Sequence, residues 1–415
     1  MVTASAGRGP IAAGTGAEGD GAGPPPLSLY IHVPWCIRKC PYCDFNSHAV
    51  PAGEAIPEEA YLDALIGDLE STLPAVWGRT VRSVFFGGGT PGLLSGRGVA
   101  RLLAEVRARI TLEPGCEITL ETNPGALEEG RYAAFRDAGV NRLSIGVQSF
   151  DDASLRRLGR VHDGGQAERA IESALRSFDN VNLDLMIGLP DQAETAAHQD
   201  VVRALGFGTT HLSVYQLTIE ANTVFAKFPP RLPEEDVVAR AQEEIDGLLA
   251  QAGFEHYEVS AYARSGRRCR HNLNYWTFGD YLGIGAGAHA KISLPGGGVR
   301  REERFRAPDS YLRNAAQGRF VSQRRTVAAD DLVFEFALNA FRLRDGFAPA
   351  LFAERTGLDP TKFEPGLREG VRRGLIARHP GRIAPTGLGM RFLNDLQALF
   401  LPAGEGGAPE PAADS

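Results

Sequence analysis

A regular alternation of short β-type runs and amphipathic helical patterns constrains the fold of this chain more than any other feature. The helical patterns include residues 58–70, 99–110 and 233–252. Such alternation predicts βαβ units and a parallel sheet. The number of units favours a full or partial (β/α) barrel over a doubly wound sheet, although the pattern separates these two folds only weakly. The β-type runs are residues 27–33, 81–86, 117–121, 142–146, 181–187, 211–217 and, less clearly, 255–259.

The pattern changes near residue 262, which predicts a second domain. Residues 263–328 are rich in Gly, Arg and aromatic residues, and we expect a connecting segment with short strands there. Residues 329–401 are expected to be mostly helical, with residues 330–343 and 388–399 as the clearest helices. The basic stretch 373–383 between these helices predicts a β-hairpin, as in a winged-helix unit.

The composition is ordinary for a soluble globular protein and argues against several classes. A net charge of −7 argues against a nucleic-acid-binding protein. No apolar run approaches the about 18 residues needed to span a bilayer, and we see no signal peptide. Residues 1–26 and 402–415 flank the folded part and bury too little apolar surface to offset ordering, so disordered tails are expected. We therefore expect a cytoplasmic protein whose barrel spans residues 27–262.

Three of the five cysteines, Cys36, Cys40 and Cys43, form a Cys-x3-Cys-x2-Cys motif directly after the first predicted strand. Clustered thiols without a disulfide framework indicate a reducing compartment and metal binding. Three thiolates at this spacing can hold three corners of a [4Fe–4S] cube and leave one iron open, whereas an electron-transfer cluster normally has four. The spacing leaves two alternatives: a zinc site with His32 or His48 as the fourth ligand, and three unligated thiols.

Unusual residues also follow the next predicted strands, at the end where a barrel carries its chemistry. Residues 87–91 follow the second strand, residues 121–124 close the third and residues 146–150 close the fourth. Asp184 lies within the fifth. Each signal is weak alone, because a Gly-rich turn is often only a tight loop and a strand-end carboxylate is often a helix cap. Their repetition after successive strands predicts one shared site.

Together these motifs resemble the radical SAM (S-adenosylmethionine) coproporphyrinogen dehydrogenase-like family, and within it the haem-chaperone branch. The resemblance implies a partial (β/α) barrel of radical SAM type with a mostly helical C-terminal domain. It also implies that the three cysteines hold a [4Fe–4S] cluster, whose free iron is chelated by the amino and carboxylate groups of SAM. It covers about residues 27–400 and rests on segments 30–36, 40–48, 86–91, 121–124, 144–150 and 183–190.

The resemblance gives the strand-end residues roles in SAM binding. The backbone at Gly88 and Gly89 is expected to approach SAM closely and to form hydrogen bonds with its ammonium and carboxylate groups, with the Thr90 hydroxyl beside it. Glu121 is expected to contact the SAM amino or ribose groups. Arg160 is expected to meet the SAM carboxylate as a charge-assisted pair.

Four further residues complete the expected SAM site. Gln148 and Asp184 are expected to form hydrogen bonds with ribose hydroxyls. Tyr30 is expected beside the cysteine loop or the sulfonium. Tyr42 is expected to stack on adenine, with simple packing of the loop as the alternative.

Two features separate the branches of this family. The coproporphyrinogen dehydrogenases carry a further Cys two positions after the third ligand, where this chain has Phe45. Segment 270–276, Arg-His-Asn-Leu-Asn-Tyr-Trp, resembles the His-Asn-x-x-Tyr-Trp signature of the chaperone branch, in which the His is implicated in haem binding. Imidazole ligates haem iron, and Tyr275 and Trp276 offer flat apolar surface. We expect His271 to bind haem, with Cys269 as a lower-ranked ligand and a structural His271 as the alternative.

The resemblance therefore implies a haem chaperone with a [4Fe–4S] cluster and SAM, which delivers haem to apo-haemoproteins such as respiratory enzymes at the membrane. The alternative is an enzyme that converts coproporphyrinogen III to protoporphyrinogen IX by radical SAM oxidative decarboxylation. The same SAM site would serve both, but Phe45 and segment 271–276 favour the chaperone. A zinc-binding interaction module is the least favoured reading. Homodimerisation and transient membrane contact are expectations carried over from the family.

Overall fold

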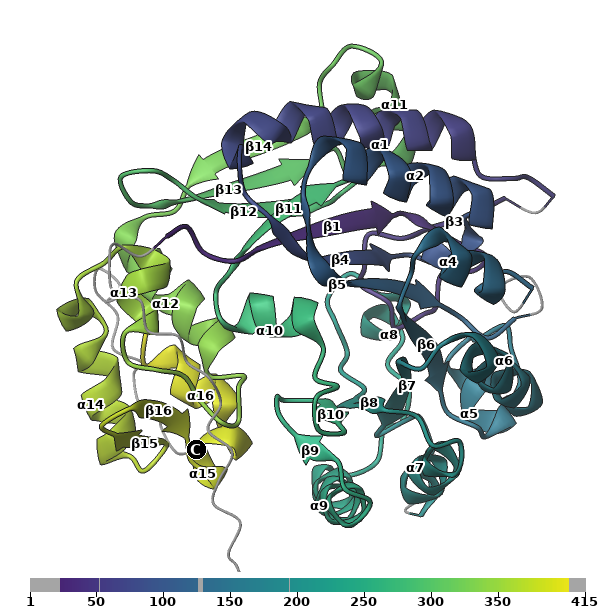
Figure 1. Ribbon diagram of the computed structural model, residues 1–415. Coiled ribbons are helices and arrows are strands. Elements are labelled where there is room, and N and C mark those ends of the chain that lie inside the picture. The colour runs from purple at the N-terminus through teal and green to yellow at the C-terminus, as the bar shows by residue number, and fades with distance from the viewer. Residues whose placement is uncertain (1–22, 52, 126–129, 194, 403–415) are drawn as a thin grey trace, which may run out of the picture.

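One large sheet organises the computed structural model, which describes residues 23–402 apart from 52, 126–129 and 194 (Figure 1). In chain order its strands are β1 (Leu27–Val33), β4 (Val81–Gly88), β5 (Leu112–Thr122), β6 (Arg142–Gln148), β7 (Val181–Ile187), β8 (His211–Gln216), β9 (Glu255–His256), β10 (Ala261–Ala263), β11 (Asp280–Ile284), β12 (His289–Ser293), β13 (Val299–Arg304) and β14 (Val321–Thr326). In space the order is β14-β13-β12-β11-β1-β4-β5-β6-β7-β8-β10-β9.

The sheet forms a partial barrel. From β11 through β1 to β8, every neighbouring pair of strands is parallel. Beyond β11 and beyond β8 the pairing becomes antiparallel. In the described part of the chain, β14 and β9 are the two ends of the strand order and do not pair with each other, so the barrel stays open. The predicted α/β fold with a partial barrel is therefore confirmed.

Side chains along the parallel strands alternate between an apolar outer face and a largely polar inner face. On β1, Leu29 enters the main hydrophobic core, whereas Tyr30 lines a cavity on the inner face. On β5, Leu120 enters the core, whereas Glu121 lines the inner face. Along each strand, polar side chains that face the site thus alternate with core residues, and the packed core residues fix their positions.

Helices cover the outer face of the sheet (Figure 1). The predicted helices 58–70, 99–110 and 233–252 correspond to α1, α2 and α9. α2 begins earlier than predicted because Ser95 acts as its N-cap and accepts a hydrogen bond from the Gly98 N–H. The covering helices are α1 (Glu58–Thr72), α2 (Gly96–Arg109), α4 (Tyr132–Ala138), α5 (Asp152–Arg157), α6 (Gly164–Ser177), α7 (Ala196–Gly206), α9 (Glu235–Gln251) and α11 (Pro308–Ala315).

Residues 263–328 extend the main sheet. Their strands β11 to β14 continue it beyond β1, and β11 pairs with β1 in parallel. The sequence predicted short strands here but not their pairing with the first strand of the chain. α10 (Arg270–Trp276) precedes β11 and lies on the inner side, between the barrel and the C-terminal domain (Figure 1).

The C-terminal domain is mostly helical and has its own core of phenylalanines and leucines. The predicted hairpin is present as β15 and β16, which pair antiparallel. The predicted helix 388–399 is divided into α15 and α16 at Phe392. The elements of this domain are α12 (Ala329–Ala340), α13 (Leu351–Thr356), α14 (Glu364–Arg372), β15 (Ile376–His379), β16 (Arg382–Pro385), α15 (Gly387–Arg391) and α16 (Leu393–Ala398).

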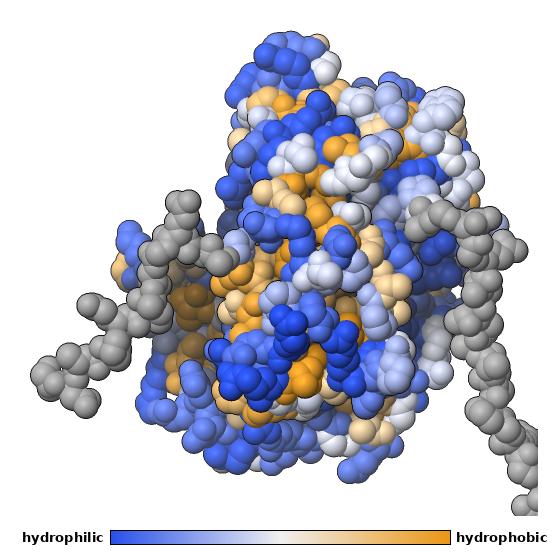
Figure 2. Space-filling view, turned by 90° about the vertical axis from the view of Figure 1, so that its left-hand side faces the viewer, coloured by the Kyte–Doolittle hydropathy of each residue, from blue (hydrophilic) through white to orange (hydrophobic). Residues whose placement is uncertain are grey.

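The side of the molecule that carries this domain presents an apolar stretch within a mostly hydrophilic surface (Figure 2). Of the predicted tails, residues 1–22 and 403–415 lie outside the described residues. Next to the first strand, the Pro25 carbonyl accepts a hydrogen bond from Arg79, and the Pro26 carbonyl accepts one from the Asp280 N–H over 2.8 Å.

Candidate functional site

The cysteine motif forms a compact loop at the carboxyl end of β1. The short strands β2 (Trp35–Cys36) and β3 (His48–Ala49) pair in parallel and close the loop between them. Within the loop, the Cys43 N–H donates to the Cys40 carbonyl over 3.1 Å and forms a turn. Cys36, Cys40 and Cys43 line one cavity of about 830 Å³, together with the carboxyl ends of the next strands. The loop therefore presents all three sulfurs to one space.

Each sulfur has a polar neighbour that suits a thiolate. The pairs are Thr90 Oγ1 donating to Cys36 Sγ over 3.4 Å, the Arg160 guanidinium donating to Cys40 Sγ over 3.8 Å, and Ser47 Oγ lying 3.7 Å from Cys43 Sγ. Burial raises the pKa of Cys36, and the hydrogen bond from Thr90 opposes this rise. Such outer partners stabilise and tune metal-bound thiolates. This donor set fits an iron–sulfur cluster.

Neither histidine considered as a fourth zinc ligand faces the three sulfurs. His32 Nε2–H donates to the Asn46 carbonyl over 2.9 Å, and its Nδ1 accepts from the Tyr30 hydroxyl over 2.8 Å. His48 Nε2 lies 3.3 Å from Asn46 Oδ1. Among the described residues that line the cysteine cavity, neither His32 nor His48 is present. The geometry therefore favours a cluster with three protein ligands over a four-ligand zinc site.

A chain of hydrogen bonds behind the sulfurs joins the ends of three strands. Asn123 donates to Thr90 Oγ1 over 2.9 Å and accepts from Arg160 over 2.5 Å. Arg160 also donates to the Gly146 carbonyl over 2.6 Å. The guanidinium expected at the SAM carboxylate is thus engaged with Asn123, Gly146 and the neighbouring thiol. Asn123 was not singled out from the sequence, where its place in segment 121–124 after a strand was the available signal.

Gly88 and Gly89 pack closely against the cysteine loop. Gly88 has a φ of +115°, which favours glycine, and a Cβ on it would lie 2.6 Å from His32. A Cβ on Gly89 would lie 2.5 Å from the Trp35 carbonyl oxygen. The Gly89 N–H donates to the Val33 carbonyl over 2.7 Å. This amide therefore fixes the cysteine loop, and the close approach of SAM to the backbone at Gly88 and Gly89 stays a prediction.

Glu121 and Asp184 bring two buried carboxyl groups to the same cavity. Asp184, in β7, accepts hydrogen bonds from Asn182 over 2.8 Å and from Ser144 over 3.2 Å. Burial and the nearby charge of Asp184 raise the pKa of Glu121 to about 8. Burial also raises the pKa of Asp184. Two buried carboxyl groups suit a cationic ligand, and SAM carries a sulfonium and an ammonium group.

Gln148 ends β6 in an unusual backbone conformation. Its φ is +69°, and the register of β6 against β7 shifts between Ile145 and Gln148. Tyr215, on β8, donates to Gln148 Oε1 over 2.7 Å, and both side chains line the cavity. Strained backbone of this kind concentrates at binding sites, where surrounding contacts hold it in place.

Tyr42 belongs to the apolar side of the cavity. Its ring packs against Phe225, with centroids 6.4 Å apart, and it joins a small cluster that includes Met186 and Leu217. Tyr42, Met186 and Leu217 all line the cavity. The sequence did not single out Met186 or Leu217. Packing of the Tyr42 loop is thus observed, and stacking on adenine stays a prediction.

Tyr30 lines a second cavity, of about 680 Å³, beside the first. Gly88, Glu121 and Phe45 line both cavities, so the two share a wall. Phe45, at the position that separates the two family branches, is well exposed and lies in this wall. The inner face of the barrel therefore offers two adjoining spaces.

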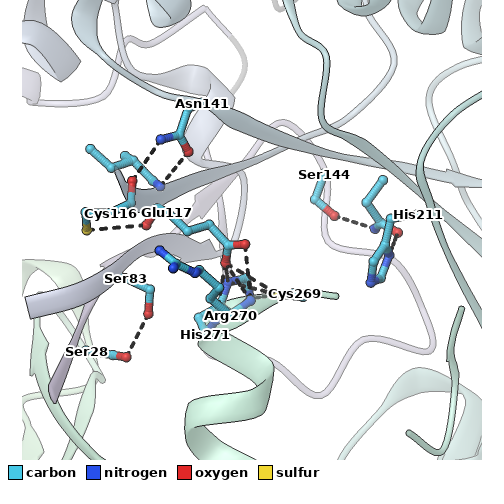
Figure 3. A network of polar contacts seen from close by, with 12 residues as sticks. Ser28, Ser83, Cys116, Glu117, Asn141, Ser144, His211, Cys269, Arg270 and His271 are labelled. Atoms are coloured by element: carbon cyan, nitrogen blue, oxygen red, sulfur yellow. Dashed lines mark hydrogen bonds and ion pairs between the residues drawn. The ribbon is translucent and has the colours of Figure 1, made fainter. Parts of the chain in front are cut away.

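His271 lines neither cavity and is enclosed at the start of α10 (Figure 3). Its Nδ1 lies 3.3 Å from Glu117 Oε1 and 3.2 Å from Cys269 Sγ, and its ring stacks on Phe85 at 4.0 Å. The Glu117 carboxylate also accepts the N–H groups of Arg270 and His271, so it caps α10 from β5. Haem binding by His271 stays a prediction, and the observed role of this residue is to anchor α10.

Comparisons with known proteins agree with this geometry. The model of the radical SAM superfamily matches residues 30–200, and that of the HemN C-terminal domain matches residues 327–392. A protein of Escherichia coli (strain K12) named heme chaperone HemW is 47% identical over 381 residues, which cover 91% of this chain and 98% of that protein. The chain belongs to the HemW family of radical SAM proteins. A HemW of Mycobacterium tuberculosis (strain ATCC 25618 / H37Rv) is 36% identical, with 89% of this chain and 93% of that protein covered.

A solved structure shows the same fold as this HemW-family chain. The radical SAM enzyme coproporphyrinogen III oxidase (HemN) of Escherichia coli matches it with a TM-score of 0.76. The match covers 91% of this chain and 90% of HemN at 22% sequence identity, so it establishes the fold alone. Within residues that the structure describes, no helix combines the length and apolar character needed to cross a membrane.

Proposed function

We propose that this chain is a haem chaperone, which holds a [4Fe–4S] cluster, SAM and haem and delivers the haem to apo-haemoproteins. The observation that carries this proposal is the 47% identity to a protein named heme chaperone HemW along nearly the full length of both chains. Phe45 supports it, because a further thiol is absent at the position where the related dehydrogenases have one.

In this proposal the first cavity holds the cluster and SAM. Cys36, Cys40 and Cys43 would ligate three irons, and the amino and carboxylate groups of SAM would chelate the open iron. Glu121 and Asp184 stabilise the positive charge of SAM from the inner face of the barrel. Further contacts come from the rest of the predicted set that lines this cavity: Tyr42, Gly88, Gly89, Thr90, Gln148 and Arg160.

The carried ligand is haem, and its destination is a protein that lacks it. Haem is held near α10, and the acceptor is an apo-haemoprotein such as a respiratory enzyme at the membrane. The chaperone works in the cytoplasm, with transient contact at the membrane surface and a homodimeric state. The haem cargo is supported by the relatives named heme chaperone, whereas the acceptor, the compartment, the membrane contact and the homodimer are carried over from the family resemblance.

Reconstitution and haem transfer test this function. Anaerobic reconstitution with iron and sulfide should give the broad absorbance near about 400 nm of an iron–sulfur cluster. Cys36→Ser should lose it, whereas Cys116→Ser, at a buried strand cysteine outside the motif, should keep it. The reconstituted protein should bind haem and pass it to an apo-haemoprotein. Failure of the wild-type protein to bind haem would contradict the proposal.

A coproporphyrinogen assay separates the chaperone from the related enzymes. With reductant, SAM and coproporphyrinogen III under anaerobic conditions, we expect no protoporphyrinogen IX. Formation of this product would favour the dehydrogenase instead, since the two functions share the SAM site.

A further inference from the structure

The second cavity has aromatic walls, most of which lie outside the cavity of the cysteine motif. Its volume of about 680 Å³ lies in the range of small-molecule sites. The Tyr275 and Tyr281 rings meet edge to face, with centroids 4.9 Å apart. Such surfaces suit a flat, largely apolar ligand. The aromatic side chains come from segments far apart in the sequence: Tyr30, Phe45, Phe85, Tyr275, Trp276, Phe278 and Tyr281.

Two histidines line this cavity, and they differ in what their ring nitrogens already contact. Both nitrogens of His32 are engaged, with Tyr30 and with the Asn46 carbonyl. His289, at the start of β12, is largely exposed, and its Nδ1 lies 3.9 Å from Glu303 Oε1 on β13. No partner for its Nε2 is found among the described residues. At 3.9 Å the Nδ1 contact is too long for a hydrogen bond, so the Glu303 carboxylate lies near the ring without fixing it, and the Nε2 is left for a metal.

The cavity also has one basic side chain without a counter-ion. Arg301 is already engaged, with Glu335 over 2.6 Å and with the Tyr281 hydroxyl over 2.7 Å. The exposed Arg306 lines the cavity, and its guanidinium has no hydrogen-bond or ion-pair partner within the described part of the chain. Its carbonyl accepts a hydrogen bond from Asn46 over 2.9 Å, which ties this corner to the cysteine loop. Arg306 is therefore the cation left for a ligand carboxylate.

We propose that haem occupies this second cavity, with His289 ligating the iron and Arg306 facing a propionate carboxylate. The inference rests on the proposed function and locates its cargo. The porphyrin lies against Tyr275 and Tyr281, and its edge reaches Phe45 in the wall shared with the first cavity. His271 then acts as a positioning residue, because it anchors the helix that carries Tyr275.

Spectroscopic titration of full-length protein with ferric haem tests the assignment. We expect His289→Ala to weaken haem binding by about tenfold or more and to shift the Soret band, and added imidazole to restore the band. Metal-free protoporphyrin IX should bind the wild type and His289→Ala equally, because it offers no iron to ligate. Arg306→Gln should weaken both porphyrins without shifting the haem Soret band. His379→Ala, at an exposed position on β15, is the matched control.

The outcomes separate this inference from the function on which it rests. If the wild type binds no haem, the chaperone function itself fails. If the wild type binds haem and His289→Ala keeps the same affinity and Soret band, only the assignment of His289 is overturned. If His271→Gln shifts the Soret band and His289→Ala does not, His271 rather than His289 ligates the iron.

Discussion

The protonation of Glu121 affects the charge of the first cavity in its ligand-free form. Its carboxyl group is buried beside Asp184, and its pKa of about 8 keeps it mostly protonated at neutral pH. A bound cation favours the ionised form and lowers that pKa again. We therefore expect binding of SAM to be coupled to loss of a proton from this residue.

We predict that SAM affinity rises with pH, by about tenfold between pH 7 and pH 9, because only the ionised fraction of Glu121 attracts the cation. The measurement is SAM binding to the reconstituted protein by calorimetry across this range. The SAM amino group titrates as well, so Glu121→Gln is the control. It should bind SAM more weakly and show a shallower slope, and an equal slope in both proteins would contradict the prediction.

Residue identities at the site were partly predictable from the sequence. Cys36, Cys40 and Cys43 could be found because a short spacing fixes their proximity. Tyr30 and His271 depend on which face of a strand or helix meets which cavity, and this is set by tertiary packing. His289, the haem ligand proposed above, carried no sequence signal, because it belongs to none of the motifs and because the packing of the sheet decides which cavity its strand faces.

Among the elements, α10 is capped by a residue of a neighbouring strand. Glu117, on β5, accepts the N–H groups at the start of this helix and a hydrogen bond from His271. Burial alone would raise the pKa of Glu117, but the hydrogen bond from His271 and the charge of Arg142 outweigh it, and the pKa is about 2. The ionised carboxylate is thus part of the folded state.

We predict that Glu117→Gln destabilises the protein by about 1–3 kcal/mol at neutral pH, because a buried charged acceptor is lost. The pKa of Glu117 is lower in the folded than in the unfolded protein. Its stabilisation is therefore complete above pH 4.5 and is lost as the pH falls toward 2. Urea unfolding at several pH values measures this. Glu59→Gln, at an exposed ion pair, should change little.

Individual strands and helices could be predicted from the sequence more reliably than the elements with which they pair. The parallel strands and the hairpin of the C-terminal domain follow from local patterns of apolar residues and turns. The place of β11 beside β1 does not, because the pairing joins Leu27 with Asp280 and no local signal spans that distance. The last predicted helix is also broken at Phe392, whose backbone is not helical, with a φ of −109° and a ψ of 49°.

At the scale of the whole molecule, the barrel and the C-terminal domain share hydrophobic residues. Phe278, just before β11, is fully buried in the core of the C-terminal domain and meets Phe336 of α12 edge to face at 5.7 Å. Its carbonyl accepts a hydrogen bond from Lys291 of β12 over 3.0 Å. Phe278 therefore joins the two parts beside the second cavity.

We predict that Phe278→Ala lowers the free energy of unfolding by about 3–5 kcal/mol, because it leaves a hole where the two parts meet. Equilibrium unfolding in urea, followed by circular dichroism, measures the change. Trp77→Ala, at a highly exposed aromatic, is the control and should stay within about 0.5 kcal/mol of the wild type. Equal effects of the two substitutions would contradict a shared core.

Among the strands that the structure describes, the open barrel leaves two sheet edges, and both are poor templates for a foreign strand. β9 has only two residues. β14 is mostly exposed, and its Arg324 and Arg325 pair with Glu302 and Glu335. An added strand would have to desolvate these charges, which protects the edge from amyloid-like aggregation. The barrel therefore stays open, and neither of these edges favours pairing with a strand of another chain.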